Sequence, residues 1–223
     1  MQIVLVRHAH SQANDRGVLS GRLPGVSLSA RGIEQSEKLV ERLGAIKIRS
    51  LQVSPLQRCS ETISPWWEKV GSSVNPRVQM LADENLVEVD YGTWSGKKLS
   101  TLSRKREWET VQNSPSAMYF PGGEGLAAVQ ARAMKSIHNA LSNKGKGSDI
   151  FVSHGDVIKS IVASVLAMHL DDFQRIVIDP ASITVLDFSS SKPRVLLMND
   201  SRSHLQDFIN APFRARNLIG GGA

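Results

Sequence analysis

The stretch that decides the fold is Ile3-Val4-Leu5-Val6-Arg7-His8, in which four apolar residues are followed directly by two basic ones. A short apolar run without alternation is typical of a strand buried on both faces, as in the parallel sheet of an α/β protein. The run is too short for a signal peptide, and the basic pair interrupts it. It therefore predicts a central first strand that ends at Arg7-His8.

Strand-like and helix-like stretches alternate along most of the rest of the chain. Further strands are expected at residues 49–53, 76–81 and 150–153, and at 182–188 and 194–198 as antiparallel neighbours at an edge. Helices are expected at residues 29–43, where Ser29 can be the N-cap, after Pro55 in a first turn, and from 156 to about 168. This alternation predicts an α/β fold, a three-layer sandwich with a mostly parallel central sheet and helices on both faces.

The alternation breaks between residues 90 and 125, a stretch rich in glycine and proline. It contains a short polar helical pattern at residues 99–111. We interpret residues 90–125 as an insertion that caps one end of the sheet, since functional loops on a rigid scaffold often have this composition. The sequence thus predicts a single domain over residues 1–223 with this cap, and a flexible tail at about 212–223.

Composition limits the partners that the protein can have. Cys59 is the only cysteine, so an internal disulfide is excluded and a cytoplasmic location is expected. No apolar run approaches the roughly 18 residues that a membrane span needs. The net charge is +6, but the basic residues are scattered, so we expect a small anionic substrate and neither a nucleic acid nor a membrane as partner. A homodimer is compatible with the sequence.

Each of three predicted strands delivers a basic side chain at its carboxyl end. The first ends in Arg7-His8, the second leads to Arg58 in the next helical turn, and that at 150–153 ends in His154-Gly155. In open α/β sheets, ligands bind at the carboxyl ends of the strands. If the three strands are parallel, the two guanidiniums and two imidazoles converge on one site.

Such a cluster suits the transfer of a phosphoryl group. Arginine grips two phosphoryl oxygens at once, and the N-terminus of a helix beginning at Gly155 adds backbone N–H donors. A neutral imidazole can attack phosphorus, and neighbouring arginines disfavour a positive charge on His8. The residues alone therefore favour His8 as a nucleophile among phosphate-binding groups.

At these residues the chain resembles the histidine phosphatase superfamily, in the branch that includes the cofactor-dependent phosphoglycerate mutases. The resemblance covers most of the chain in the order of the family's motifs. The matching residues are Arg7-His8, Ser11, Asn14, Ser20-Gly21-Arg22, Ser54-Pro55-Leu56-Gln57-Arg58, Leu86-Val87-Glu88, Tyr91 to Gly96, Pro121 to Glu124 and Ser153-His154-Gly155.

The resemblance implies a role for each site residue. His8 would form a phosphohistidine, Glu88 would be the general acid, and Arg7, Arg58 and His154 would bind the phosphoryl oxygens. The other expected substrate-binding residues are Ser11, Asn14, Arg22 and Gly155. No metal and no cofactor is expected.

Phosphatase activity on a small phosphorylated metabolite is favoured over mutase activity. The stretch between Trp94 and Pro121 lacks the long arginine- and proline-rich insertion of phosphoglycerate mutases. A cofactor-dependent mutase of that type stays the alternative.

Two other classes of protein remain open. In a metal-dependent hydrolase, His8, His10, His154 and Asp156 offer suitable ligand types, although Arg7 would repel a dication. The second class is a non-catalytic protein that keeps the fold and binds a phosphorylated ligand without turnover.

Overall fold

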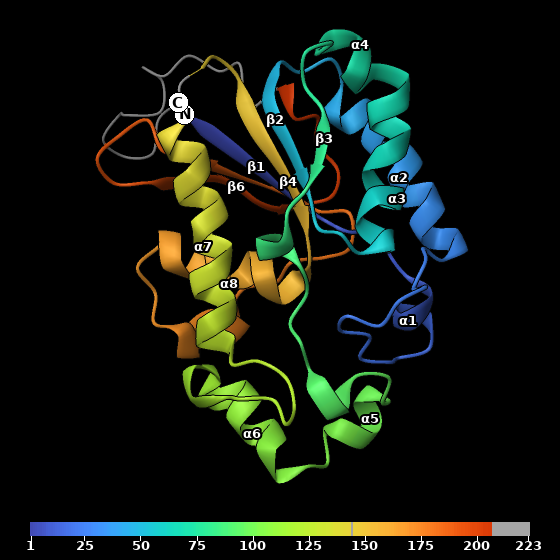
Figure 1. Cartoon of the computed structure of the whole chain (residues 1–223), viewed down its shortest axis with the longest axis vertical. Helices are drawn as coiled ribbons and strands as arrows, with labels where there is room; N and C mark the ends of the chain where they lie inside the picture. The colour runs from blue at the N-terminus through green and yellow to red at the C-terminus, as the bar shows by residue number, and fades with distance from the viewer. Residues whose placement is uncertain (144, 207–223) are drawn as a thin grey trace.

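A mixed six-stranded sheet forms the centre of the protein, and helices cover both of its faces (Figure 1). The computed structural model describes residues 1–143 and 145–206. The strands are β1 (Gln2–Arg7), β2 (Ile48–Val53), β3 (Met80–Ala82), β4 (Ser148–Ser153), β5 (Ile183–Asp187) and β6 (Arg194–Asp200). Their order is β3-β2-β4-β1-β5-β6, and only β5 runs against the others. The predicted α/β class with a mostly parallel sheet is confirmed.

The helices lie between the strands in sequence. The α-helices are α1 (Gln12–Asp15), α2 (Ala30–Leu43), α3 (Gln57–Trp66), α4 (Ser72–Val74), α5 (Leu99–Leu102), α6 (Arg106–Asn113), α7 (Leu126–Ser142) and α8 (Gly155–Val165). The other helical turns are η1 (Trp67–Gly71), η2 (Glu84–Leu86), η3 (Gly92–Trp94), η4 (Pro115–Ala117) and η5 (Leu170–Arg175). No helix within residues 1–143 and 145–206 is both long and apolar enough to cross a membrane.

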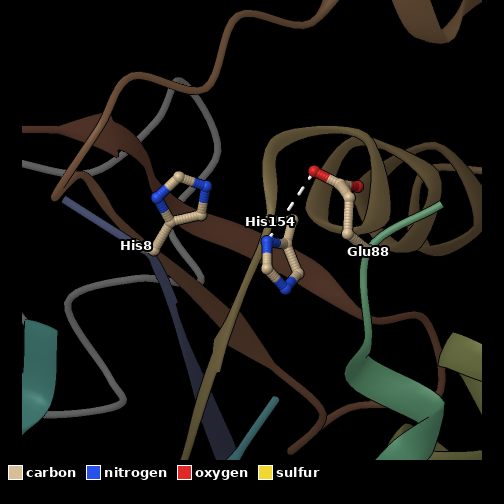
Figure 2. Close-up of side chains that lie close together, drawn as sticks. All are labelled: His8, Glu88 and His154. Carbon is tan, nitrogen blue, oxygen red and sulfur yellow. Dashed lines mark ion pairs between the residues drawn. The ribbon is translucent and has the colours of Figure 1, made fainter. Parts of the chain in front are cut away.

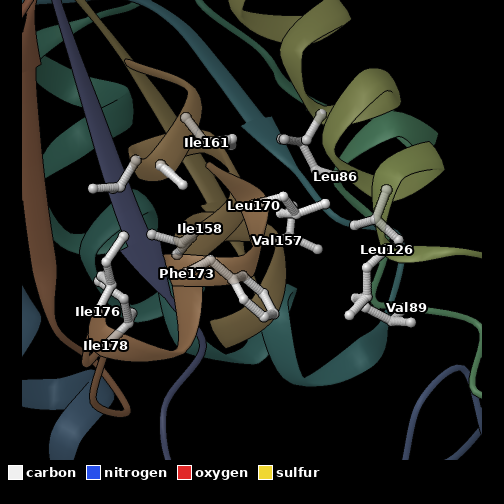
Figure 3. Packing of buried hydrophobic residues seen from close by; sticks show 14 of the residues in the cluster. Leu86, Val89, Leu126, Val157, Ile158, Ile161, Leu170, Phe173, Ile176 and Ile178 are labelled. Carbon is white, nitrogen blue, oxygen red and sulfur yellow. The ribbon is translucent and has the colours of Figure 1, made fainter. Parts of the chain in front are cut away.

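The apolar run of β1 is buried because it contributes to two cores. Ile3 and Leu5 pack in a cluster with α7, α8 and η5, part of which Figure 3 shows. Val4 and Val6 point to the opposite face and pack in a cluster with α2 and α3. Successive side chains of a strand alternate between faces, so a strand covered on both sides must be apolar throughout. Each such side chain stabilises the fold by about 1.5–3 kcal/mol.

Parallel pairing brings the three predicted junctions to one edge of the sheet. β4 lies between β1 and β2 and is parallel to both, with Arg7 opposite Ser153 and Val53 opposite Val152. The residues that follow these strands are therefore neighbours in space. This register places His8, the Ser54 loop and His154 side by side.

Several element boundaries differ from the sequence-based predictions. The third strand begins at Met80 and not at residue 76, because Pro76 and Arg77 form a turn in which the Val78 N–H donates to the Asn75 carbonyl at 3.0 Å. Pro55 precedes α3, whose N-cap is Leu56. α8 already begins at Gly155, and it ends at Val165 shortly before Ala167, whose φ is +54°.

The polar helix expected at residues 99–111 is two helices, α5 and α6. Leu102 and Val111 are both buried in the same cluster. At 3.6 residues per turn they would lie on opposite faces of one continuous helix. The turn between α5 and α6 lets both side chains enter the core. The tail expected at 212–223 lies outside the described residues.

Close contact between α2 and the chain after β1 requires glycine at position 32. The Ser29 N–H donates to the His10 carbonyl at 2.9 Å, and a Cβ on Gly32 would lie 1.9 Å from that carbonyl oxygen. A side chain at position 32 would therefore push α2 away from the His10 backbone, or displace the segment that carries His8 and His10.

We expect Gly32→Ala to lower the free energy of unfolding by about 1–3 kcal/mol, as overpacking does. Urea unfolding measures this effect. Arg31→Ala, at the exposed neighbouring position, is the matched control and should change stability by about 0.5 kcal/mol or less. Equal stability of Gly32→Ala and the wild type would contradict this account of the contact.

Candidate active site

A cavity of about 380 Å³ opens at the carboxyl edge of β1 and β4. The residues that line it come from segments far apart in sequence, because the sheet gathers the strand ends. Among them are Arg7, His8, Asn14, Gly21, Glu88, Tyr91, Leu99, Gly155, Asp156, Lys159, Gln174 and Asp179. Figure 2 shows His8, Glu88 and His154, which approach one another from β1, the chain after η2 and the chain after β4.

The imidazole of His8 has a defined orientation at the end of β1. Its side chain is buried, and Nδ1 lies 2.8 Å from the Ala9 carbonyl oxygen. A carbonyl only accepts, so Nδ1 carries the proton and Nε2 has the lone pair. The Arg58 Nε–H donates to this Nε2 at 3.3 Å. Nε2 is therefore the nitrogen available to attack an electrophile.

The surroundings of His8 keep its imidazole uncharged. Burial lowers the pKa of His8 well below its ordinary value, and the positive charges of Arg58 and Arg7 lower it further. At neutral pH the ring is therefore neutral and nucleophilic.

Arg58 joins the two imidazoles of the site. It is the second residue of α3, and only 1% of its surface is exposed. Its Nη2 donates to the Gly21 carbonyl at 2.8 Å and lies 3.2 Å from Nδ1 of His154. With its Nε–H on His8, the guanidinium links the His8 ring, which lines the cavity, to the His154 ring, which like Arg58 is buried and outside the cavity lining.

His154 is the N-cap of α8 and is fully buried. Because Arg58 only donates, Nδ1 of His154 accepts, and its proton lies on Nε2, 2.8 Å from the Ser54 hydroxyl oxygen. Burial and the charge of Arg58 lower the pKa of His154 well below its ordinary value.

Arg7 lies at the end of β1 with its guanidinium at the cavity wall. Its Nη1 donates to the Ile178 carbonyl at 2.5 Å. Its Nε is buried and makes no hydrogen bond among the described residues. An unpaired buried donor is unfavourable, and an anionic oxygen in the cavity would be a suitable partner.

Glu88 supplies a carboxyl group on the side of the cavity opposite His8. Its Oε1 accepts from the Val89 N–H at 2.9 Å, and its Oε2 lies 3.7 Å from His154 Nδ1 (Figure 2). Burial, helped by the negative charge of Asp156, raises the pKa of Glu88 to about 7. This carboxyl group can therefore both donate and accept a proton near neutral pH.

Comparison with known proteins identifies the family. The model of the histidine phosphatase superfamily (branch 1) matches residues 3–201. The chain belongs to this superfamily. The resemblance inferred from the Arg7-His8, Arg58, Glu88 and His154 motifs is thus confirmed.

Relatives of this histidine phosphatase include both phosphatases and a mutase. It is 26% identical over 210 residues to phosphoserine phosphatase 1 of Hydrogenobacter thermophilus, covering 93% of this chain and 96% of the relative. It is 25% identical over 187 residues to the 2,3-bisphosphoglycerate-dependent phosphoglycerate mutase of Thermoplasma acidophilum, covering 82% and 86%. The fold matches the crystal structure of a putative alpha-ribazole-5'-P phosphatase from Escherichia coli with a TM-score of 0.79, at 22% identity and 91% and 98% coverage.

Four further residues were expected to bind substrate in this histidine phosphatase, and the structure brings two of them to the cavity. Asn14 and Gly155 line it. Ser11 is buried beneath Asn14, where it is the N-cap of α1 and its hydroxyl donates to Asn14 Oδ1 at 2.9 Å. Ser11 can thus orient the Asn14 side chain without lining the cavity itself.

Arg22 lies outside the cavity lining, in contrast to the expectation. Its Nη2 donates to Glu124 Oε1 at 2.7 Å, and its Nε donates to the Glu88 carbonyl at 2.9 Å. Arg132 makes parallel contacts with the same two residues, at 2.9 and 3.2 Å. These contacts fix the backbone that carries the Glu88 side chain, so Arg22 acts on the site through Glu88.

Sequence reasoning gave no role in phosphate chemistry to several residues at the cavity. Tyr91 donates its hydroxyl to Asp156 Oδ2 at 2.9 Å, Lys159 and Gln174 line the wall, and Ser54 contacts His154. Tyr91 and Ser54 lie in matched motifs, which was the available signal. Gln174 has no local signal, because only the packing of η5 against α8 brings it to the site.

The site does not suit a divalent metal ion. Ligand atoms of His8, Glu88 and His154 lie within 4.8 Å of one another. However, Arg58 donates to Nε2 of His8 and to Nδ1 of His154, the nitrogens that would have to bind the ion, so a dication would have to lie against its guanidinium. Of the two other metal ligands considered, His10 contacts the Ser29 hydroxyl through Nδ1 at 3.0 Å and is outside the cavity lining. Asp156 lines the cavity, but its carboxylate accepts from the Tyr91 hydroxyl at 2.9 Å and lies 3.4 Å from Lys159 Nζ.

Proposed function

We propose that this histidine phosphatase hydrolyses small phosphomonoesters through a phosphohistidine at Nε2 of His8. The observation that carries the proposal is the buried Arg58 guanidinium, which contacts Nε2 of His8 and Nδ1 of His154. Together with Arg7, it surrounds a neutral nucleophile with donors for the three phosphoryl oxygens.

In the first step, the lone pair of His8 Nε2 attacks phosphorus and the ester P–O bond breaks. The protonated carboxyl group of Glu88 gives its proton to the leaving oxygen, so the alcohol departs neutral. The Nδ1–H of His8 stays on the Ala9 carbonyl and stabilises the positive charge of the phosphorylated ring.

In the second step, water attacks the phosphorylated His8. The Glu88 carboxylate accepts a proton from this water, the P–N bond breaks, and inorganic phosphate leaves. The cycle returns both His8 and Glu88 to their initial protonation states, which a pKa of about 7 for Glu88 permits.

The Ser54 hydroxyl allows His154 to change its protonation when the phosphoryl group binds. A hydroxyl can accept from or donate to the ring nitrogen. If Nδ1 of His154 takes a proton from the bound phosphate monoanion and Nε2 passes its own through the Ser54 hydroxyl to solvent, Ser54 then donates to Nε2 and the Nδ1–H donates to a phosphoryl oxygen, while Arg58 turns to the same anion. His154 then stabilises the transferring group without a net positive charge.

Residues 90–125 are proposed to cap the single domain and to shape the cavity for the leaving group. Tyr91 and Leu99 of this segment line the cavity. A mutase stays the second candidate, because the relative from Thermoplasma acidophilum carries that name and the first chemical step is common to both. A cytoplasmic location and a homodimer stay predictions from the sequence.

Phosphate release from a panel of small phosphomonoesters tests the function. We expect turnover by the wild type, its loss in His8→Ala with the fold retained by circular dichroism, and no effect of EDTA. Activity that EDTA removes and added metal restores would favour a metal-dependent hydrolase. Absence of turnover with every ester would favour a non-catalytic binding protein, and transfer between two organic acceptors without phosphate release would favour a mutase.

The pH dependence should follow Glu88 on the alkaline side. Because the acid form of Glu88 is needed for the first step, kcat/KM for an alkyl phosphate, which reports groups of the free enzyme, should fall as the pH rises through about 7. The lowered pKa of His8 means that no loss should occur on the acid side near 6.5, where an ordinary histidine titrates.

Glu88→Gln should lower kcat/KM for the alkyl phosphate, which reports the first step and not the shared dephosphorylation, by about 10²–10⁴-fold, the usual contribution of a general acid. The loss should be smaller with para-nitrophenyl phosphate, whose leaving group needs little protonation. Glu34→Gln, at an exposed position of α2, is the matched control. Equal losses with both substrates would contradict the role of Glu88.

A further inference from the structure

Lys159 places a positive charge in the cavity away from the phosphoryl-binding groups. It lies on α8, one helical turn after Gly155, and both residues line the cavity. Four residues of α-helix span about 6 Å along the axis. The side chain of Lys159 is only 18% exposed, which is unusual for a lysine.

The ammonium of Lys159 is held in position by its neighbours. It donates to Gln174 Oε1 at 3.1 Å, lies 3.4 Å from Asp156 Oδ1, and lies 5.6 Å from the centre of the Phe173 ring. Gln174 in turn donates to the Val111 carbonyl of α6 at 3.2 Å. A side chain ordered in this way loses little further conformational entropy when it binds a ligand.

The phosphoryl group does not need this cation. Arg58 already contacts Nε2 of His8 and Nδ1 of His154, and Arg7 lines the cavity together with His8. An ammonium has three N–H donors, and the contacts with Gln174 and Asp156 occupy two of them. In our proposal, a group on the remainder of the substrate takes the third.

Resting on the proposed phosphatase function, we propose that Lys159 is a specificity-determining residue that binds a carboxylate on the leaving group. The preferred substrates are then phosphomonoesters of small hydroxy acids. Asp156 and Asp179 also line the cavity. These two carboxylates repel a second, doubly charged phosphate about twice as strongly as they repel a singly charged carboxylate.

A purely structural role of Lys159, as the counter-ion of Asp156, makes a different prediction. Loss of the lysine would then disturb Asp156, and through it Tyr91 and Glu88, whatever the substrate. A carboxylate subsite is disturbed only for substrates that carry the carboxylate. The two roles are separated by substrates that differ in this group alone.

The experiment compares 3-phosphoglycerate with glycerol 3-phosphate, which has a hydroxymethyl group in place of the carboxylate. We expect Lys159→Gln to lower kcat/KM for 3-phosphoglycerate by about 10- to 100-fold more than for glycerol 3-phosphate, mainly through KM, as expected when a hydrogen bond to a charged group is lost. Lys159→Arg should restore part of the preference. Lys38→Gln, at an exposed position of α2, should leave both values unchanged.

Equal losses with the two substrates would overturn the proposal and leave Lys159 a structural partner of Asp156. A wild type that shows no preference for 3-phosphoglycerate would overturn it as well. If the wild type hydrolyses neither these esters nor para-nitrophenyl phosphate, the proposed function itself fails. Circular dichroism shows whether the Lys159→Gln protein is folded, independently of its activity.

Discussion

The site depends on a buried positive charge whose contacting partners are neutral. Arg58 is almost fully buried, and its hydrogen bonds go to two imidazoles and a backbone carbonyl. Burying a cation without an anion costs several kcal/mol. An anion that binds at this point therefore stabilises the folded protein. The same charge disfavours protonation of His8 and His154. One constraint thus creates both the anion site and the uncharged nucleophile.

The sheet and the chain after η2 contribute to the site from different directions. The parallel β2-β4-β1 order brings Arg58, His154 and His8 together, and the buried cores on both faces stabilise that order. Glu88 comes from outside the sheet, and the contacts of Arg22 and Arg132 with its carbonyl hold it in place. The groups proposed to hold the phosphoryl group thus lie at or just after the ends of strands. The proposed proton donor is on a separately braced segment.

The sequence predicted the features that local patterns determine. The continuous apolar runs of β1 and β4 identified central strands, and Arg7-His8 and His154-Gly155 marked their functional ends. α7 was missed although Leu126, Val129 and Ala133 recur at helical spacing. Packing between distant segments determines three other features: the position of Arg22, the break between α5 and α6, and the position of Gln174 in the cavity wall. No local pattern encodes such packing.

The most direct test of the account is to trap the phosphorylated protein. The wild type is mixed rapidly with a phosphomonoester, quenched with denaturant during turnover, digested, and analysed by mass spectrometry of the peptides. The account predicts one added phosphoryl group on the peptide that contains His8, attached at the imidazole, and none on the peptide that contains His154. Turnover without a phosphorylated His8, or a phosphoryl group on another residue, would contradict it.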